Sequence, residues 1–96
     1  MKNLKNFGDK MIKMLSLYEV CADLLIKGFP AFRSVSPHSP FDVVILKDGK
    51  LLSIEITKGW VNGDKEFYHK HSNHNFDYLA VWFADGKIKY IPELNP

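Results

Sequence analysis

Residues 9–27 carry apolar side chains at a helical spacing. At about 100° per residue, one face of such a helix collects Met11, Met14, Leu15, Tyr18, Cys21, Ala22 and Leu25. Asp9 is suited to cap the start of the helix, and Gly28 is placed to end it. Glu19 falls beside the apolar face, so its carboxylate is expected to border the core. The pattern predicts one amphipathic helix that packs against the rest of the chain.

Short apolar runs follow the helix and are typical of strands. They lie near residues 31–35, 41–47 and 50–57. The stretch SPHSP, between the first two runs, contains two prolines and two serines and predicts a loop. Asp48-Gly49 separates the second run from the third, and this dipeptide favours a two-residue hairpin turn. We therefore expect the second and third strands to pair as antiparallel neighbours.

The second half of the chain alternates between polar and apolar stretches. Residues 61–75, VNGDKEFYHKHSNHN, are polar and are expected to form a short or irregular helix and a loop. A strand is expected near 77–83, and a last strand in KIKYIP follows the Asp85-Gly86 turn. The resulting order is αβββαβ plus a final strand. It predicts an α/β fold with a mixed, mostly buried sheet.

The composition of the chain excludes only a few classes of protein. The 96 residues suit a single domain, and the net charge of +2 neither identifies nor excludes a nucleic-acid-binding protein. Cys21 is the one cysteine, so no internal disulfide can form, and a small core residue is expected there. The chain shows no secretory signal and no apolar stretch long enough for a membrane. An intracellular, cytoplasmic protein is expected, carried by a host, a phage or a mobile element.

Two acids stand inside the strand pair. In a hairpin with a two-residue turn at 48–49, paired positions sum to 97, so Asp42 would face Glu55. Directly opposed residues have Cβ atoms about 4.5–5.5 Å apart. Two carboxylates about 4 Å apart repel by about 4 kcal/mol at an effective dielectric constant of about 20. Because a domain is stable by only about 5–15 kcal/mol, this repulsion calls for compensation.

Three explanations for the paired acids remain open at this stage. Both acids can lie at a solvated sheet edge, or one can keep its proton with a raised pKa. Alternatively, a divalent cation can lie between them, and Mg²⁺ favours one or two carboxylates with water and substrate phosphate as further ligands. Thr57 falls on the same face as Glu55, and Lys58 stands at the strand end.

The order of these residues resembles the PD-(D/E)xK nucleases. Their pattern is a helical Glu, then Pro and Asp opening a strand, then (Asp/Glu)-x-Lys in the next strand. The matching residues are Glu19, Pro40-Phe41-Asp42 and Glu55-Ile56-Thr57. Residues 24–59 and 76–92 are most similar to group I intron homing endonucleases and archaeal Holliday-junction resolvases. The resemblance implies a restriction-endonuclease-like αβββαβ core over nearly the whole chain, as one nuclease-like domain, 1–96.

The resemblance also implies a chemistry. Asp42, Glu55 and the Ile56 carbonyl would bind Mg²⁺ or Mn²⁺, and Glu19 would help to position metal or water. The reaction would be hydrolysis of a DNA phosphodiester by metal-activated water. The position of the family's lysine holds Thr57, and Lys58 comes one residue late, on the opposite face of a regular strand.

The missing lysine leaves several alternatives. A bulge before Gly59 would turn Lys58 back towards the acids, or Lys65 or Lys70 would reach in from the following segment. Without any such lysine, the chain would be a slow nuclease or a DNA-binding module that has lost catalysis. A third hypothesis is a structural subunit with no role on DNA.

Basic and aromatic residues near the acids are candidates for DNA contact, with ordinary surface charge as the alternative. They are Arg33, His38, Lys58, Trp60, Lys65, His69, Lys70 and His71. Of the histidines His69, His71 and His74, the last two are also spaced for zinc on one helical turn, although no fourth ligand is evident. A homodimer or larger homo-oligomer is expected, because so small a nuclease presents little surface to DNA.

Overall fold

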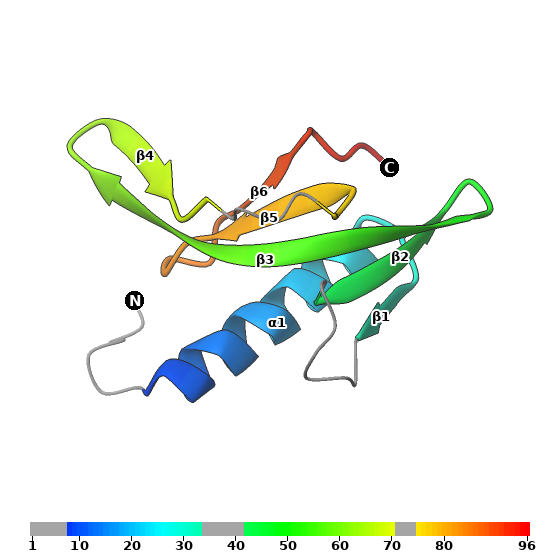
Figure 1. The fold of residues 1–96 in the computed structure, drawn as a ribbon, viewed down its shortest axis with the longest axis horizontal. Coiled ribbons are helices and arrows are strands. Elements are labelled where there is room, and N and C mark those ends of the chain that lie inside the picture. The colour runs from blue at the N-terminus through cyan, green and yellow to red at the C-terminus, as the bar shows by residue number, and fades with distance from the viewer. Residues whose placement is uncertain (1–7, 34–41, 71–74) are drawn as a thin grey trace.

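The computed structural model describes residues 8–33, 42–70 and 75–96. In these ranges it contains one helix and six strands (Figure 1). They are α1 (Asp9–Ile26), β1 (Ala31–Arg33), β2 (Val43–Lys47), β3 (Lys50–Asn62), β4 (Lys65–Tyr68), β5 (Tyr78–Trp82) and β6 (Ile88–Ile91). The predicted helix and the strands predicted near 31–35, 41–47, 50–57, 77–83 and 87–92 are present within the described residues, and the strand that begins at Lys50 runs on to Asn62.

The sheet is mixed, as the sequence predicted. Its strand order is β1-β2-β3-β5-β6, and β4 pairs with β3 alone. The β3–β5 pair is parallel, and every other pair is antiparallel. The β2–β3 register pairs Lys47 with Lys50 and Val43 with Ile54, which confirms the predicted sum of 97. Asp48 and Gly49 both have positive φ angles, 53° and 76°, as a tight two-residue hairpin turn requires.

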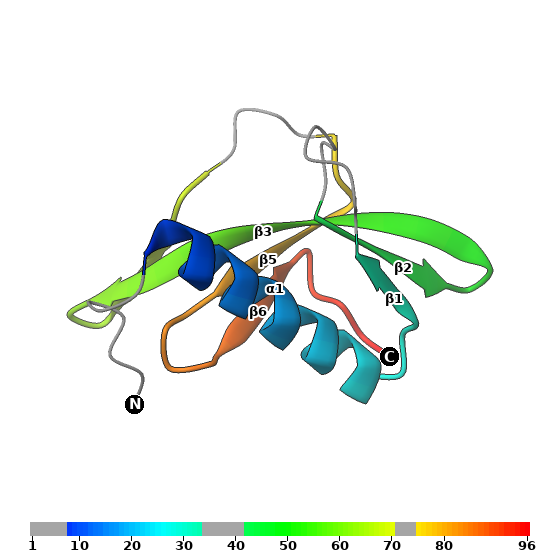
Figure 2. The same ribbon diagram turned by 90° about the horizontal axis from the view of Figure 1, so that it is seen from below.

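Helix α1 lies across one face of the sheet (Figure 2), but with a different side inward than predicted. The buried helix residues are Ser16, Val20 and Leu24. Most of the predicted core face is exposed, including Met11, Met14, Tyr18 and Leu25. The prediction was wrong because α1 has apolar side chains on two opposite sides, and helical spacing alone does not tell which side meets the sheet. Ser16 tolerates burial because its hydroxyl donates to the Lys13 carbonyl oxygen at 2.9 Å.

The segment after Thr57 is also different from the prediction. Instead of a helix, residues 61–68 continue β3, turn at Gly63, which has a φ of +66°, and return as β4. Trp60 pairs with Phe67, and their rings stack with centroids 5.9 Å apart. This cross-strand aromatic pair stabilises a hairpin over a helix. We call residues 59–68 the arm, because its two strands pair only with each other beyond the body of the sheet (Figure 1).

The sheet has apolar residues on both faces. Val43, Ile45, Ile54 and Ala80 join Val20 and Leu24 of the helix in one cluster, and half-buried Cys21 packs against it. Leu79, Val81 and Phe83 form a second cluster on the opposite face. Gly59 lets this second cluster close up, since a Cβ there would lie 2.7 Å from both the Phe83 and the Val81 side chains. Within the described ranges, no helix is long and apolar enough to cross a bilayer.

Candidate metal and DNA site

A gap in strand pairing lies along one edge of β3. Ile54 accepts a hydrogen bond from the Asp42 N–H at 3.0 Å, and Lys58 accepts one from the His69 N–H at 3.3 Å. Both acceptors lie at even positions of β3 and therefore face the same edge. Between Ile54 and Lys58, neither of the described strands β2 and β4 pairs with this edge of β3. Ile56 is the even position in between, so its backbone faces the gap.

The Asp42 side chain fills part of this gap. Its Oδ2 accepts a hydrogen bond from the Ile56 N–H at 2.8 Å, where a further residue of β2 would otherwise pair. The N–H and C=O of one strand residue point to the same edge. The carbonyl oxygen of Ile56 is therefore directed into the gap as well, on the Asp42 side. This arrangement orients the Asp42 carboxylate beside a backbone oxygen.

Glu55 completes the cluster. Its pKa is raised to about 7, first by burial, then by the negative charge of Asp42 and by a side-chain hydrogen bond to Asp42. The positive charge of Lys13 opposes this rise. The two acids therefore lie close together, as the hairpin register predicted, and the raised pKa of Glu55 agrees with one of the three open explanations, that one acid keeps its proton.

The donor set suits a hard divalent cation. Two carboxylates and a directed carbonyl oxygen are ligands that Mg²⁺ and Mn²⁺ prefer. The raised pKa of Glu55 fits the same site. A proton relieves the repulsion between the two carboxylates in the metal-free protein, and a bound cation would relieve it in the same way. The described residues contain no group of three or more His, Cys, Asp or Glu side chains placed for a metal. Water and substrate phosphate would therefore have to supply the remaining ligands, which is usual for Mg²⁺.

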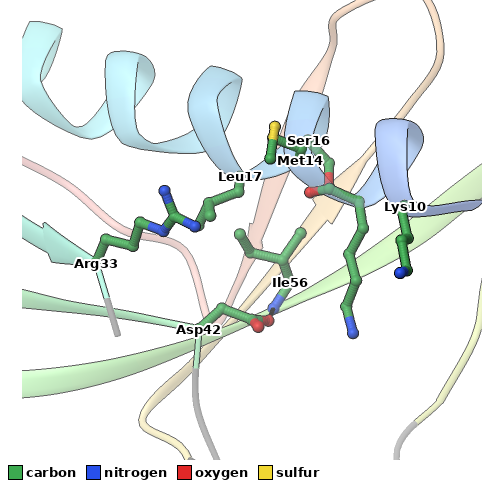
Figure 3. A pocket seen from close by; sticks show the side chains of 8 residues that line it. Lys10, Met14, Ser16, Leu17, Arg33, Asp42 and Ile56 are labelled. Carbon is green, nitrogen blue, oxygen red and sulfur yellow. Dashed lines mark hydrogen bonds between the residues drawn. The ribbon is translucent and has the colours of Figure 1, made fainter. Parts of the chain in front are cut away.

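A pocket of about 550 Å³ opens beside this cluster, between α1 and the sheet (Figure 3). Asp42 and Ile56 lie on its sheet side, and Lys10 and Arg33 lie on either side of them (Figure 3). A smaller pocket of about 180 Å³ also borders Ile56 and includes Lys58. The larger pocket therefore combines Asp42 with cationic side chains, which favours an anionic ligand.

Glu19 lies elsewhere. Its Oε1 accepts a hydrogen bond from Trp82 Nε1 at 2.9 Å, and the described pocket lining does not include it. One turn later, Asp23 accepts a hydrogen bond from the Tyr90 hydroxyl at 2.7 Å. These two acids attach α1 to β5 and β6. The assisting role implied for Glu19 stays a prediction, and the contact that the structure gives it is structural.

The lysine question is partly answered. The β3–β5 register runs unbroken from Ile54 to Lys58, so the bulge that would return Lys58 to the face of Glu55 is not formed. Thr57 is buried and donates its hydroxyl to the His69 carbonyl oxygen at 2.7 Å. Lys65 lies in β4, and Lys70 follows it as an exposed residue. Sequence analysis missed Lys10 and Lys13, since the misassigned helix face hid their position beside the acids.

Four of the residues predicted to contact DNA share one face of the arm and its base. Lys58 and Trp60 are two residues apart in β3, so their side chains point to the same face. Lys65 and His69 lie on this face as well, on the other strand of the arm and just after it. Trp60 contacts both Phe67 and His69, with ring centroids 5.9 and 4.8 Å apart. The opposite face holds Glu66, which is bound by Lys87 and Lys89. The first face thus carries two lysines and an aromatic cluster, whereas the acid lies on the other.

The remaining predicted residues are placed as follows. Arg33 lines the larger pocket, and its guanidinium lies 3.4 Å from the Tyr18 hydroxyl. His38, His71 and His74 lie outside the described residues, so a zinc site at the histidines stays untested.

Comparisons with known proteins support the fold. No family model matches the chain, and no curated protein matches it. Among solved structures, the chain is similar to a bacterial homing endonuclease, I-Ssp6803I, with a TM-score of 0.72 and 12% sequence identity. The match covers 86% of this chain and 64% of that protein's chain. The chain therefore has the α/β fold of a nuclease, with a mixed sheet and one helix in its described part.

Proposed function

We propose that the protein is a metal-dependent DNA endonuclease that hydrolyses phosphodiester bonds. The observation that supports this function best is the convergence of Asp42, Glu55 and the Ile56 backbone at one gap in the sheet. The similarity of the fold to a homing endonuclease agrees with it. DNA is the proposed substrate, and Mg²⁺ or Mn²⁺ is the proposed cofactor.

In this mechanism, Asp42, Glu55 and the Ile56 carbonyl would hold the cation. The bound ion would stabilise negative charge on the phosphate and lower the pKa of a water that attacks it. The hydrogen bond from Ile56 N–H keeps one Asp42 oxygen fixed, so less ordering is needed when the ion binds. Glu55 would have to be ionised to hold the cation, because a ligating carboxylate is deprotonated.

The arm and the pocket would place the DNA. Phosphates would contact Lys58 and Lys65 on the arm and Arg33 at the pocket, and Trp60 and His69 would offer flat rings to bases or sugars. His38, Lys70 and His71 remain proposed contacts. These cations offset the repulsion between DNA and the two acids.

A second candidate is a DNA-binding module that has lost catalysis. The burial of Thr57 favours it, because the position of the family's lysine cannot present a charge to the site. Such a protein would bind DNA with a strong dependence on salt and would not cut it with Mg²⁺ or Mn²⁺.

Plasmid cleavage distinguishes the two functions. We expect the wild-type protein to nick or linearise supercoiled DNA with Mg²⁺ or Mn²⁺ and to be inactive in EDTA. Asp42→Ala and Glu55→Ala should each lower the rate by about 100-fold or more, whereas the exposed control Glu93→Ala should not. Equal cutting by all four proteins would contradict the mechanism. DNA binding without any cutting would support the binding module.

A further inference from the structure

The nuclease pattern places a lysine two residues after the strand acid. In this chain that position is occupied by Thr57, whose side chain is buried. Thr57 is 5% exposed, and its hydroxyl is held by the His69 carbonyl. Lys58 points to the face of β3 that α1 covers, where it borders the smaller pocket but not the larger pocket that contains Asp42. A positive charge in the larger pocket, beside Asp42, therefore has to come from another element.

Helix α1 brings a lysine to this place. Lys13 lines the larger pocket together with Asp42 and Ile56, and it also lines the smaller pocket together with Ile56 and Thr57. It therefore lies between the two pockets, directly across from the gap in β3. Its helical neighbours Ser16 and Leu17 also line the larger pocket, which fixes the direction in which this side of α1 faces.

We propose that Lys13 replaces the missing motif lysine and binds the scissile phosphate beside Asp42. The inference rests on the proposed nuclease function and identifies a phosphate-binding residue for it. Lys10 and Arg33, at the sides of the same pocket (Figure 3), would contact the neighbouring phosphates. The ammonium group would neutralise charge that develops on the phosphate during hydrolysis.

The lining of the two pockets favours Lys13 over Lys58. Lys58 borders only the smaller of the two described pockets, away from Asp42, while Lys13 borders both. A side chain that shares the larger pocket with Asp42 and both pockets with Ile56 is well placed for a phosphate bound beside Asp42.

The experiment compares Lys13→Met, Lys13→Arg, Lys58→Met and the remote control Lys50→Met, at the β2–β3 turn. Methionine keeps an unbranched stem of similar length, and thermal melts verify that each variant is folded. Cleavage kinetics with Mg²⁺ give kcat and KM separately. Binding to a labelled duplex in EDTA, over a range of salt concentrations, gives a measurement that is independent of metal and of cleavage.

For Lys13→Met we expect kcat to fall by about 100-fold or more, and the slope of log affinity against log salt to decrease by about one. Lys13→Arg should restore part of both, and Lys50→Met should match the wild type. A Lys13→Met protein that cuts at the wild-type rate, or a larger loss of kcat in Lys58→Met, would overturn the assignment. If the wild type itself never cuts while Asp42→Ala binds DNA normally, the nuclease function fails. The phosphate contact of Lys13 is then decided by the salt slope alone.

Discussion

At the scale of single residues, the candidate site contains an unfavourable interaction between two acidic side chains, Asp42 and Glu55. Glu55 and Asp42 share a hydrogen bond and repel each other when both are ionised. The Ile56 N–H fixes one oxygen of Asp42, so this aspartate cannot simply turn away without losing a backbone hydrogen bond. Such pairs are frequent at sites that bind a cation or move a proton.

The raised pKa of Glu55 predicts a pH dependence of stability. Below about pH 4.5 the carboxyl holds a proton in both states, and above about pH 7 it is ionised in both. Between these values the folded protein binds more protons than the unfolded chain. The free energy of unfolding of the metal-free protein should therefore fall as pH rises through this window, by about 1–2 kcal/mol after allowing for solvent screening.

Urea unfolding in EDTA between pH 4 and 8 measures this effect, with Glu55→Gln as the matched control. The difference in stability between wild type and Glu55→Gln should shift in favour of the variant as pH rises. Adding Mg²⁺ at pH 7.5 should stabilise the wild type more than the variant. If the two proteins lose stability in parallel and respond equally to Mg²⁺, Glu55 does not have the proposed environment.

At the scale of elements, acidic side chains attach the helix to the sheet. The Glu19 carboxylate accepts a hydrogen bond from the fully buried Trp82 of β5, and Asp23 accepts one from Tyr90 of β6. These contacts hold α1 over β5 and β6, while Lys13, nearer the start of the helix, lies over the gap in β3. The orientation of the helix thus determines which of its cations face the site.

Glu19 variants separate a structural role from a catalytic one. Glu19→Ala leaves the Trp82 indole N–H without this acceptor and should lower the free energy of unfolding by about 1–3 kcal/mol. Glu19→Gln keeps an acceptor oxygen and should lose less than about 1 kcal/mol. Urea unfolding measures both values, and equal stability of the two variants would contradict the structural role.

The same Glu19→Gln protein then tests the role that the family resemblance implies. A well-folded Glu19→Gln variant that cuts DNA at the wild-type rate would assign Glu19 to the helix–sheet contact. A large loss of cleavage with unchanged stability would support its action on metal or water.

At the scale of the whole molecule, the described part of each chain offers one candidate site and one arm. Glu55, Ile56, Lys58 and Trp60 follow one another along β3, which continues from the body of the sheet into the arm (Figure 1). A single site hydrolyses one strand at a time. Cutting both strands at a two-fold DNA site would need two chains related by the same symmetry.

We therefore expect a homodimer or a larger homo-oligomer, in solution or on DNA. Sedimentation velocity of the free protein, and of the protein with a labelled duplex, should give at least twice the mass of one chain. A protein that stays monomeric in both conditions while it linearises plasmid DNA would contradict this expectation.

The sequence by itself determined the local geometry of the candidate site. The Asp48-Gly49 turn fixes the β2–β3 register, and the register brings Asp42 to Glu55, because side-chain alternation along paired strands leaves little freedom. The other strands of the sheet body were also predicted, because their pattern of apolar and polar residues is a short-range property of the sequence. The arm was missed, because its pairing of Trp60 with Phe67 lies in a polar stretch that resembles a loop or an irregular helix.

Only the tertiary structure decided which side of α1 faces the sheet. Apolar side chains lie on two opposite sides of this helix, and the choice depends on the total fit of Val20 and Leu24 to the sheet rather than on spacing within the helix. That choice moves Glu19 to Trp82 and Lys13 to the acids. The pairing of the acids is thus encoded locally, whereas the cations around them are brought in by packing between distant segments.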